Sequence, residues 1–137
     1  MKIYIAAPWQ KRYRAQEIMR LLEAEGHTVT STWLKQDDAL PSTTNDPVAN
    51  DGYATLDLDD VAQADMLVAL NPPDFEYAGT GGRHVEFGYA IALKKRIVLI
   101  GQRSNIFHWL QHVVVYEHVI DFLLAMASKG EGEGVHG

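Results

Sequence analysis

The strongest constraint on the fold is a series of short apolar runs separated by segments with helical spacing. The runs are KIYIAA (2–7), DMLVAL (65–70), RIVLIG (96–101) and VVVY (113–116). Continuous apolar strands are typical of a parallel sheet that helices cover on both faces. Between the first two runs, residues 11–26 place Ile18, Met19, Leu21 and Leu22 at helical spacing and end at Gly26, and residues 27–34 alternate like a strand. The chain therefore opens with a βαβ unit.

Later segments extend this alternation. Residues 55–64, 79–95 and 117–128 have helical character, and residues 35–52 are rich in Asp, Asn, Pro, Ser and Thr, which predicts a long loop. We expect an α/β fold: a single-domain, flavodoxin-like three-layer sandwich with about five parallel strands in the order 2-1-3-4-5. Residues 1–127 form this domain, and the Gly-rich residues 128–137 are expected to be a disordered tail.

Composition narrows the possible partners. The formal charge is −6, which argues against polymeric nucleic acid and favours a small molecule. Cysteine is absent, which excludes disulfides, thiolate metal sites and a cysteine nucleophile. No run is long enough to be a signal peptide or to span a membrane, so a cytoplasmic location without a membrane partner is expected.

The expected sheet places its ligand site at the carboxyl ends of the strands, near the point where strand order reverses. Three segments converge there: the loop 7–12 after the first strand, the start of the helix that carries Asp57, and the turn 71–82 that leads into the helix with Glu86. The sequence therefore predicts a cleft between these segments.

Glu86 is the leading candidate for chemistry in this cleft. It shares a helical stripe with Tyr89, Ala90 and Leu93, which the sheet is expected to cover. A half-buried carboxylate is costly unless it is hydrogen-bonded, so this acid is expected to react or to bind a ligand. The alternative is an acid placed near a helix start by the helix dipole. For Asp57 the alternative is a helix cap or a solvated face.

Other candidates are more ambiguous. Tyr4 fits a core position as well as a site, and Trp9 could pack in the core or stack on a flat ring. Asp74 and Glu76 lie in a Pro-containing loop. GTGGRH (79–84) fails both the dinucleotide and P-loop patterns, although its backbone amides could hold an anion or sugar hydroxyls. The histidines, including His108 and His112, lack metal-ligand spacing, so no metal or cofactor is expected.

Three segments together resemble the nucleoside 2-deoxyribosyltransferases and the related deoxynucleoside monophosphate N-glycosidases. They are KIYIAAPW (2–9), DLDDVAQADMLVAL (57–70) and GTGGRHVEFGYAIALKKRIVLIG (79–101). The resemblance covers about residues 1–101 in order. It implies that Glu86 attacks the anomeric carbon, that Asp57 protonates or positions the base, and that Tyr4 orients the nucleophile. By the same resemblance Trp9 packs on the base.

The resemblance also implies a homo-oligomer in which a neighbouring subunit completes the site, with Ser104 and Asn105 as candidates for that role. Thr80 departs from the family, because the transferases often have an aspartate there and the monophosphate hydrolases a phosphate-binding serine. The predicted substrate-binding residues are therefore Trp9, Asp74, Gly79, Thr80, Arg83 and Asn105.

The expected activity is cleavage of an N-glycosidic bond and transfer of 2-deoxyribose between bases through a covalent intermediate on Glu86. Hydrolysis of 2′-deoxynucleoside 5′-monophosphates by the same site stays open, because Thr80 does not decide between them and Arg83 could favour a phosphate. A non-catalytic nucleotide sensor is the alternative of another class, because such scaffolds carry many functions.

Overall fold

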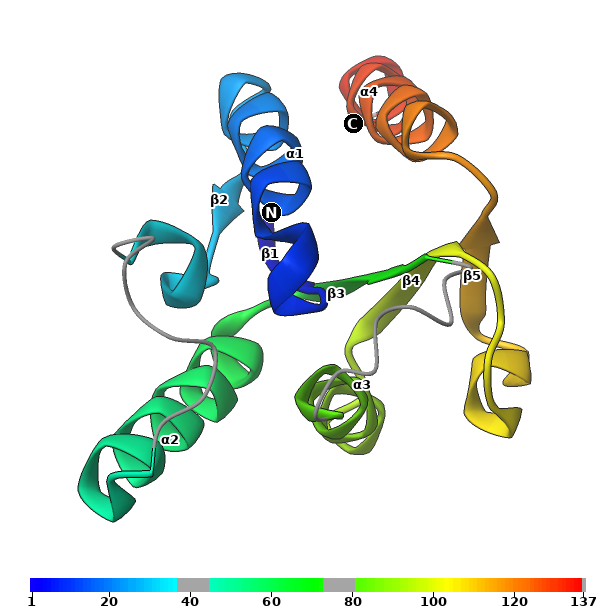
Figure 1. Cartoon of the computed structure of the whole chain (residues 1–137). Coiled ribbons are helices and arrows are strands. Elements are labelled where there is room, and N and C mark those ends of the chain that lie inside the picture. The colour runs from blue at the N-terminus through cyan, green and yellow to red at the C-terminus, as the bar shows by residue number, and fades with distance from the viewer. Residues whose placement is uncertain (37–44, 73–80, 137) are drawn as a thin grey trace.

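A computed structural model describes residues 1–36, 45–72 and 81–136. Its sheet has five parallel strands: β1 (Lys2–Ala6), β2 (Thr28–Val29), β3 (Met66–Asn71), β4 (Arg96–Gly101) and β5 (Val113–Tyr116). Their order is β2-β1-β3-β4-β5 (Figure 1). The predicted fold class and strand order are confirmed.

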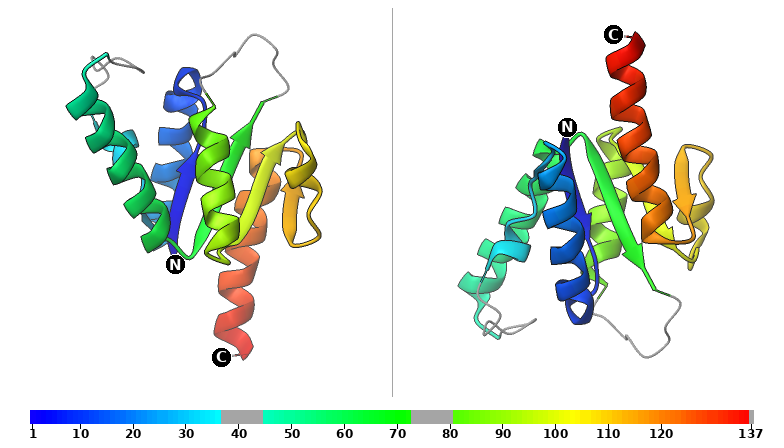
Figure 2. Two further views of the ribbon diagram at one scale, coloured as in Figure 1. Left: turned by 90° about the horizontal axis from the view of Figure 1, so that it is seen from below. Right: turned by 90° about the horizontal axis from the view of Figure 1, so that it is seen from above.

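Among the described residues, four α-helices form the outer layers. Helices α1 (Arg12–Ala24) and α4 (Val119–His136) cover one face of the sheet, and α2 (Pro47–Gln63) and α3 (Gly82–Ala92) cover the other (Figures 1 and 2). Side chains alternate along β1, so Ile3 and Ile5 pack under α1 and α4, whereas Tyr4 packs with residues of α2 and α3. This register directs the Tyr4 side chain toward the two helices that carry the predicted acids.

Strand β2 is much shorter than the predicted strand at residues 27–34. It ends after Val29, and residues 32–35 form a short 3-10 helix, η2 (Thr32–Lys35). The cause is side-chain competition for the backbone of β1: the Ile5 N–H donates to Ser31 Oγ at 2.7 Å, and Trp33 Nε1 donates to the Ile5 carbonyl at 2.9 Å. These two bonds occupy the Ile5 backbone groups that a longer β2 would use.

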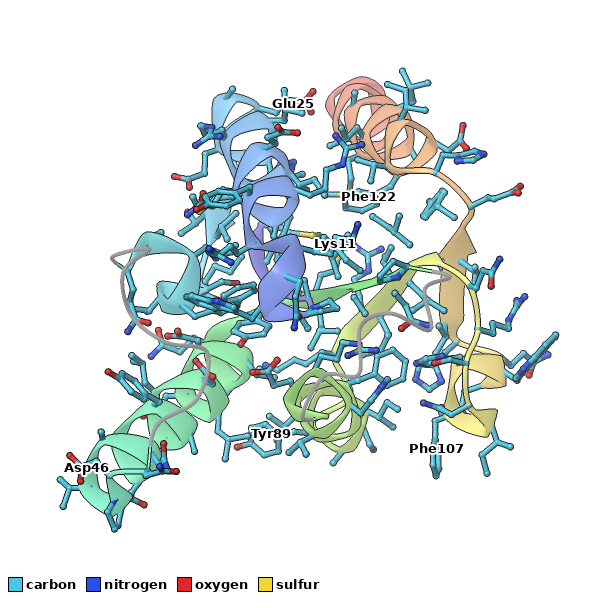
Figure 3. The ribbon with its side chains drawn as sticks, viewed as in Figure 1. Lys11, Glu25, Asp46, Tyr89, Phe107 and Phe122 are labelled. Carbon is cyan, nitrogen blue, oxygen red and sulfur yellow. The ribbon has the colours of Figure 1, made fainter. Side chains whose placement is uncertain are left out.

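Helix α2 begins earlier than predicted. Its N-cap is Asp46, which accepts from the Val48 N–H at 3.0 Å, and Pro47 occupies the first turn, where its missing N–H costs nothing (Figure 3). Residues 47–52, predicted as part of a long loop, are therefore helical. The rest of that prediction falls partly on residues 37–44, which lie outside the described residues.

Helix α4 is assigned to Val119–His136, so its backbone continues through most of the segment expected to be a tail, and it projects past the edge of the sheet where β1 begins (Figure 2). The domain boundary at residue 127 stays a prediction. In the described part of the chain, no helix has both the length and the apolar character needed to cross a membrane.

Candidate active site

Tyr4 and Glu86 meet on the face of the sheet that α2 and α3 cover. Tyr4 is fully buried, and its hydroxyl donates to Glu86 Oε2 at 2.7 Å. The two residues are 82 positions apart in sequence, and the close packing of α3 on β1 joins them. Glu86 is half-buried, whereas Phe87 and Ala90 are the α3 residues that face the core. The prediction that the sheet covers Leu93 together with Glu86 is wrong, because the Leu93 side chain is exposed.

The environment of Glu86 favours its neutral form. Burial raises the pKa of Glu86 from 4.5 to about 8, and the negative charges of Asp57 and Asp60 and a hydrogen bond to Asp57 act in the same direction. The bond from Tyr4 opposes the rise, because a hydroxyl donor stabilises a carboxylate. Burial and the neighbouring acids also raise the pKa of Tyr4 well above 10, so Tyr4 is a phenol donor at neutral pH.

Asp57 is the second carboxyl of the pair. Burial and the charge of Asp60 raise its pKa from 3.8 to about 6, while the hydrogen bond with Glu86 lowers it. These directions describe a protonated Glu86 that donates to an ionised Asp57. Between about pH 6 and 8 the two carboxyls together hold one proton. Such a pair contains one ionised and one protonated acid, the combination that glycosyl chemistry uses.

The position of Asp57 in α2 differs from the prediction. Asp57 lies well inside α2 rather than at its start, and Asp46 caps the helix, so the alternative that Asp57 is a cap is wrong. Glu86 lies in the second turn of α3, which starts after Gly81 in a left-handed conformation with φ of 88°.

Asp60 was missed as a site residue. It is only 8% exposed and accepts from the Thr32 N–H at 2.9 Å. The run Asp57–Leu58–Asp59–Asp60 contains a signal for it, since residues three apart share a helical face.

Aromatic side chains lie beyond the end of β1. Trp9 opens the 3-10 helix η1 (Trp9–Lys11), and its ring centroid is 6.4 Å from that of Trp33 in η2. The Arg12 guanidinium lies over the Trp9 ring at 4.6 Å. Trp33 was predicted only as a strand residue, and its role as a neighbour of Trp9 follows from the early end of β2.

A polar network joins the ends of β3 and β4 to α3. Asn71, 3% exposed, donates from Nδ2 to the Gln102 carbonyl and to Ser104 Oγ, and its Oδ1 accepts from Arg83 Nη2 at 3.5 Å. Arg83 Nε is buried without a hydrogen-bond partner among the residues described. Burial lowers the pKa of Arg83. Asn71 was not predicted as a site residue, because its side-chain amide hydrogen-bonds a loop about 30 residues further along the chain.

Asn105 and His108 have local structural contacts. Asn105 Oδ1 accepts from the Phe107 N–H at 2.9 Å and caps the 3-10 helix η3 (Ile106–Trp109). His108, 2% exposed, accepts from the Ser104 N–H at its Nδ1, 2.9 Å away, and packs edge-on against Phe87. No cluster of His, Asp or Glu in the described ranges has metal-binding geometry.

Three predicted substrate-binding residues, Asp74, Gly79 and Thr80, lie outside the described residues, as does Glu76. A cavity of about 490 Å³ lies elsewhere, lined by residues that include Met66 and Arg96, where β3 and β4 begin, and Phe122 of α4. Neither Asp57 nor Glu86 lines it, so it is not part of the site.

The model of the family described as nucleoside 2-deoxyribosyltransferase matches residues 3–126. Among solved structures, a CMP N-glycosidase from Clostridium botulinum has 21% identity and a TM-score of 0.63, over 93% of this chain and 98% of that one. A 2-deoxyribosyltransferase from Bacillus psychrosaccharolyticus has 20% identity and a TM-score of 0.71, over 90% of each chain. No curated protein matches.

Proposed function

Because the chain belongs to the nucleoside 2-deoxyribosyltransferase family, we propose that it cleaves the N-glycosidic bond of a 2′-deoxyribonucleoside and transfers the sugar to a second base. The family match covers residues 3–126 and identifies an enzyme of the transferase or N-glycosidase kind. The observation that carries the finer proposal is the Tyr4–Glu86 bond of 2.7 Å beside a second, half-buried acid, Asp57.

In the first step, a Glu86 carboxylate oxygen attacks C1′ of the sugar. The C1′–N bond breaks with its electron pair leaving on the base, and Asp57 gives the base a proton. The reactive form of the pair therefore has its single proton on Asp57 and a negative charge on Glu86, so the proton that Glu86 holds in the free protein first moves to Asp57 along their hydrogen bond. A deoxyribosyl ester of Glu86 is the intermediate.

In the second step, a nitrogen of another base attacks C1′. The ester bond breaks, Glu86 leaves as a carboxylate, and Asp57 accepts the proton that the incoming base loses. Two displacements at one carbon give net retention, as in retaining glycosidases. If water attacks instead of a base, the product is free sugar.

Tyr4 prepares the nucleophile. Its hydroxyl binds Oε2 and fixes the rotation of the carboxyl group, which leaves Oε1 as the attacking atom. The phenol also stabilises the negative charge that Glu86 must carry before attack. Trp9, whose ring has Arg12 against it and Trp33 nearby, packs on the base.

The test is incubation of the protein with a deoxynucleoside and a different free base, followed by chromatography. A new nucleoside supports transfer, and mass spectrometry of the acid-quenched enzyme should find a deoxyribosyl adduct on the peptide with Glu86. Glu86→Gln should form neither product nor adduct. Tight nucleotide binding without turnover would favour the sensor alternative.

Hydrolysis of a deoxynucleoside 5′-monophosphate is the second candidate, and Arg83 favours it. The unpartnered Arg83 Nε, at the start of α3, is a donor that a phosphate oxygen could satisfy. Arg83→Gln should then raise the KM for a monophosphate at least about tenfold, the value of one charge-assisted bond, and leave the KM for the nucleoside unchanged. Equal effects on both substrates would count against a phosphate contact.

We also propose a homo-oligomer in which a neighbour completes the site. Ile106, Phe107 and Trp109 of η3 are 77%, 57% and 68% exposed, and Phe107 points away from the sheet (Figure 3). Such an apolar surface beside Asn105 suits a protein interface. Mixing inactive Glu86→Gln and Asn105→Ala subunits should restore part of the activity if sites are shared, whereas an active Asn105→Ala enzyme would remove Asn105 from the proposal.

A further inference from the structure

Asp60 is a third acid beside the carboxyl pair, and the mechanism above does not use it. It follows Asp57 by three positions in α2, so the two side chains share a helical face. Asp60 is 8% exposed. Burying an acid so close to two others costs free energy unless hydrogen bonds compensate for the lost water.

The contacts of Asp60 fit an ionised carboxylate held in one place. Its Oδ2 accepts from the Thr32 N–H at 2.9 Å, and its backbone carbonyl accepts from Thr30 Oγ1 at 2.9 Å. An ionised carboxylate is an acceptor only, which suits an N–H partner. None of the Lys or Arg side chains of the described residues forms an ion pair with Asp60, so its charge is not neutralised locally.

We propose that Asp60 is a positioning residue that acts through its negative charge, keeping one proton on the Asp57–Glu86 pair at neutral pH. This inference rests on the proposed function of that pair. Asp60 itself touches neither the sugar nor the base. A carboxylate fixed near two other carboxyls makes it harder for both of them to ionise together.

The charged and titratable groups around the pair come from three elements. Tyr4 faces it from β1, Asp57 and Asp60 belong to α2, and Glu86 belongs to α3. The charge of Asp60 raises the pKa of Asp57 and of Glu86, and it is smaller than burial as a cause for both. Without it, Asp57 and Glu86 would both lose protons at lower pH, so a smaller fraction of the protein would hold a proton for the leaving base at neutral pH.

The test compares the pH profile of kcat/KM for Asp60→Asn with that of the wild type. Asparagine keeps an oxygen acceptor for the Thr32 N–H and removes the charge. Both limbs of the profile should move to lower pH by on the order of one unit. Such a shift corresponds to a tenfold weaker binding of the proton by the Asp57–Glu86 pair. Asp59→Asn removes an exposed charge from the same helix and is the matched control, with an unchanged profile.

Asp60→Glu restores the charge and should return the limbs toward wild-type positions. If Asp60→Asn lowers activity equally at every pH with unmoved limbs, the residue is only structural and the proposal is wrong. If the wild type shows no turnover, the proposed function fails, but ¹³C NMR titration of the Asp57 and Glu86 carboxyls still decides this inference. Unchanged carboxyl titrations in Asp60→Asn would overturn it.

Discussion

Replacing Glu86 by glutamine should stabilise the protein at neutral and alkaline pH. Burial raises the pKa of Glu86, so the folded chain binds this proton more tightly than the unfolded chain does. Stability from a raised acid pKa is complete below the unfolded value and is lost as pH rises toward the folded value. Glutamine has no proton to lose, and it keeps an oxygen acceptor for Tyr4 and an N–H donor for Asp57.

The size of the effect follows from the two pKa values. A change from 4.5 to about 8 corresponds to about 4 to 5 kcal/mol, because each pH unit is 1.36 kcal/mol. The free energy of unfolding of Glu86→Gln should therefore match that of the wild type near pH 4 and exceed it by about 4 kcal/mol above pH 8. The same substitution removes the nucleophile, so stability rises as activity disappears.

The assay is urea unfolding followed by circular dichroism at a series of pH values from 4 to 9. Glu23→Gln, which neutralises an exposed acid on α1, is the matched control and should follow the wild-type curve. A difference between Glu86→Gln and wild type that stays constant with pH would refute the reasoning. So would a variant that is less stable than the wild type at pH 8.

Three further substitutions test separate contacts. Tyr4→Phe removes the donor to Glu86 Oε2, so kcat/KM at pH 7 should fall about tenfold to a hundredfold; unchanged kinetics would show that this bond is not used. Asp57→Asn should lower kcat for ordinary nucleosides by about a hundredfold or more, but should spare substrates whose leaving base is acidic and departs without a proton. Equal losses for both kinds of substrate would exclude Asp57 as the proton donor. Gly101→Ala should cost about 2 kcal/mol or more in urea unfolding, because φ is 116° and the new Cβ would lie 2.1 Å from the Asn71 carbonyl oxygen; an unchanged midpoint would contradict this.

Most of the fold could be predicted from sequence because its signals are local. Apolar runs separated by helical spacing predict buried parallel strands, and the position of GTGGRH after DMLVAL places the Glu86 helix at the carboxyl edge of the sheet. The Asp46–Pro47 pair is a helix start signal of the same kind, so the early start of α2 was within reach of sequence reasoning.

The end of β2 was not predictable in this way. Residues 27–34 alternate like a strand, but Ser31 and Trp33 take the Ile5 backbone groups that would continue the ladder. Ser31 follows Ile5 by 26 positions and Trp33 follows it by 28, so these contacts are not local in sequence. They also bring Trp33 next to Trp9.

By itself, then, the sequence determined the strands, the helices and the edge where Glu86 lies, because period and composition report which faces are buried, and the strand order follows from the usual arrangement of such sheets. Only the tertiary structure decided that Tyr4 binds Glu86, that Asp57 lies inside a helix, and that Asp60 is buried beside them. The physical reason is that the protonation state of a carboxyl depends on burial and on neighbouring charges, and both come from elements far apart in the chain.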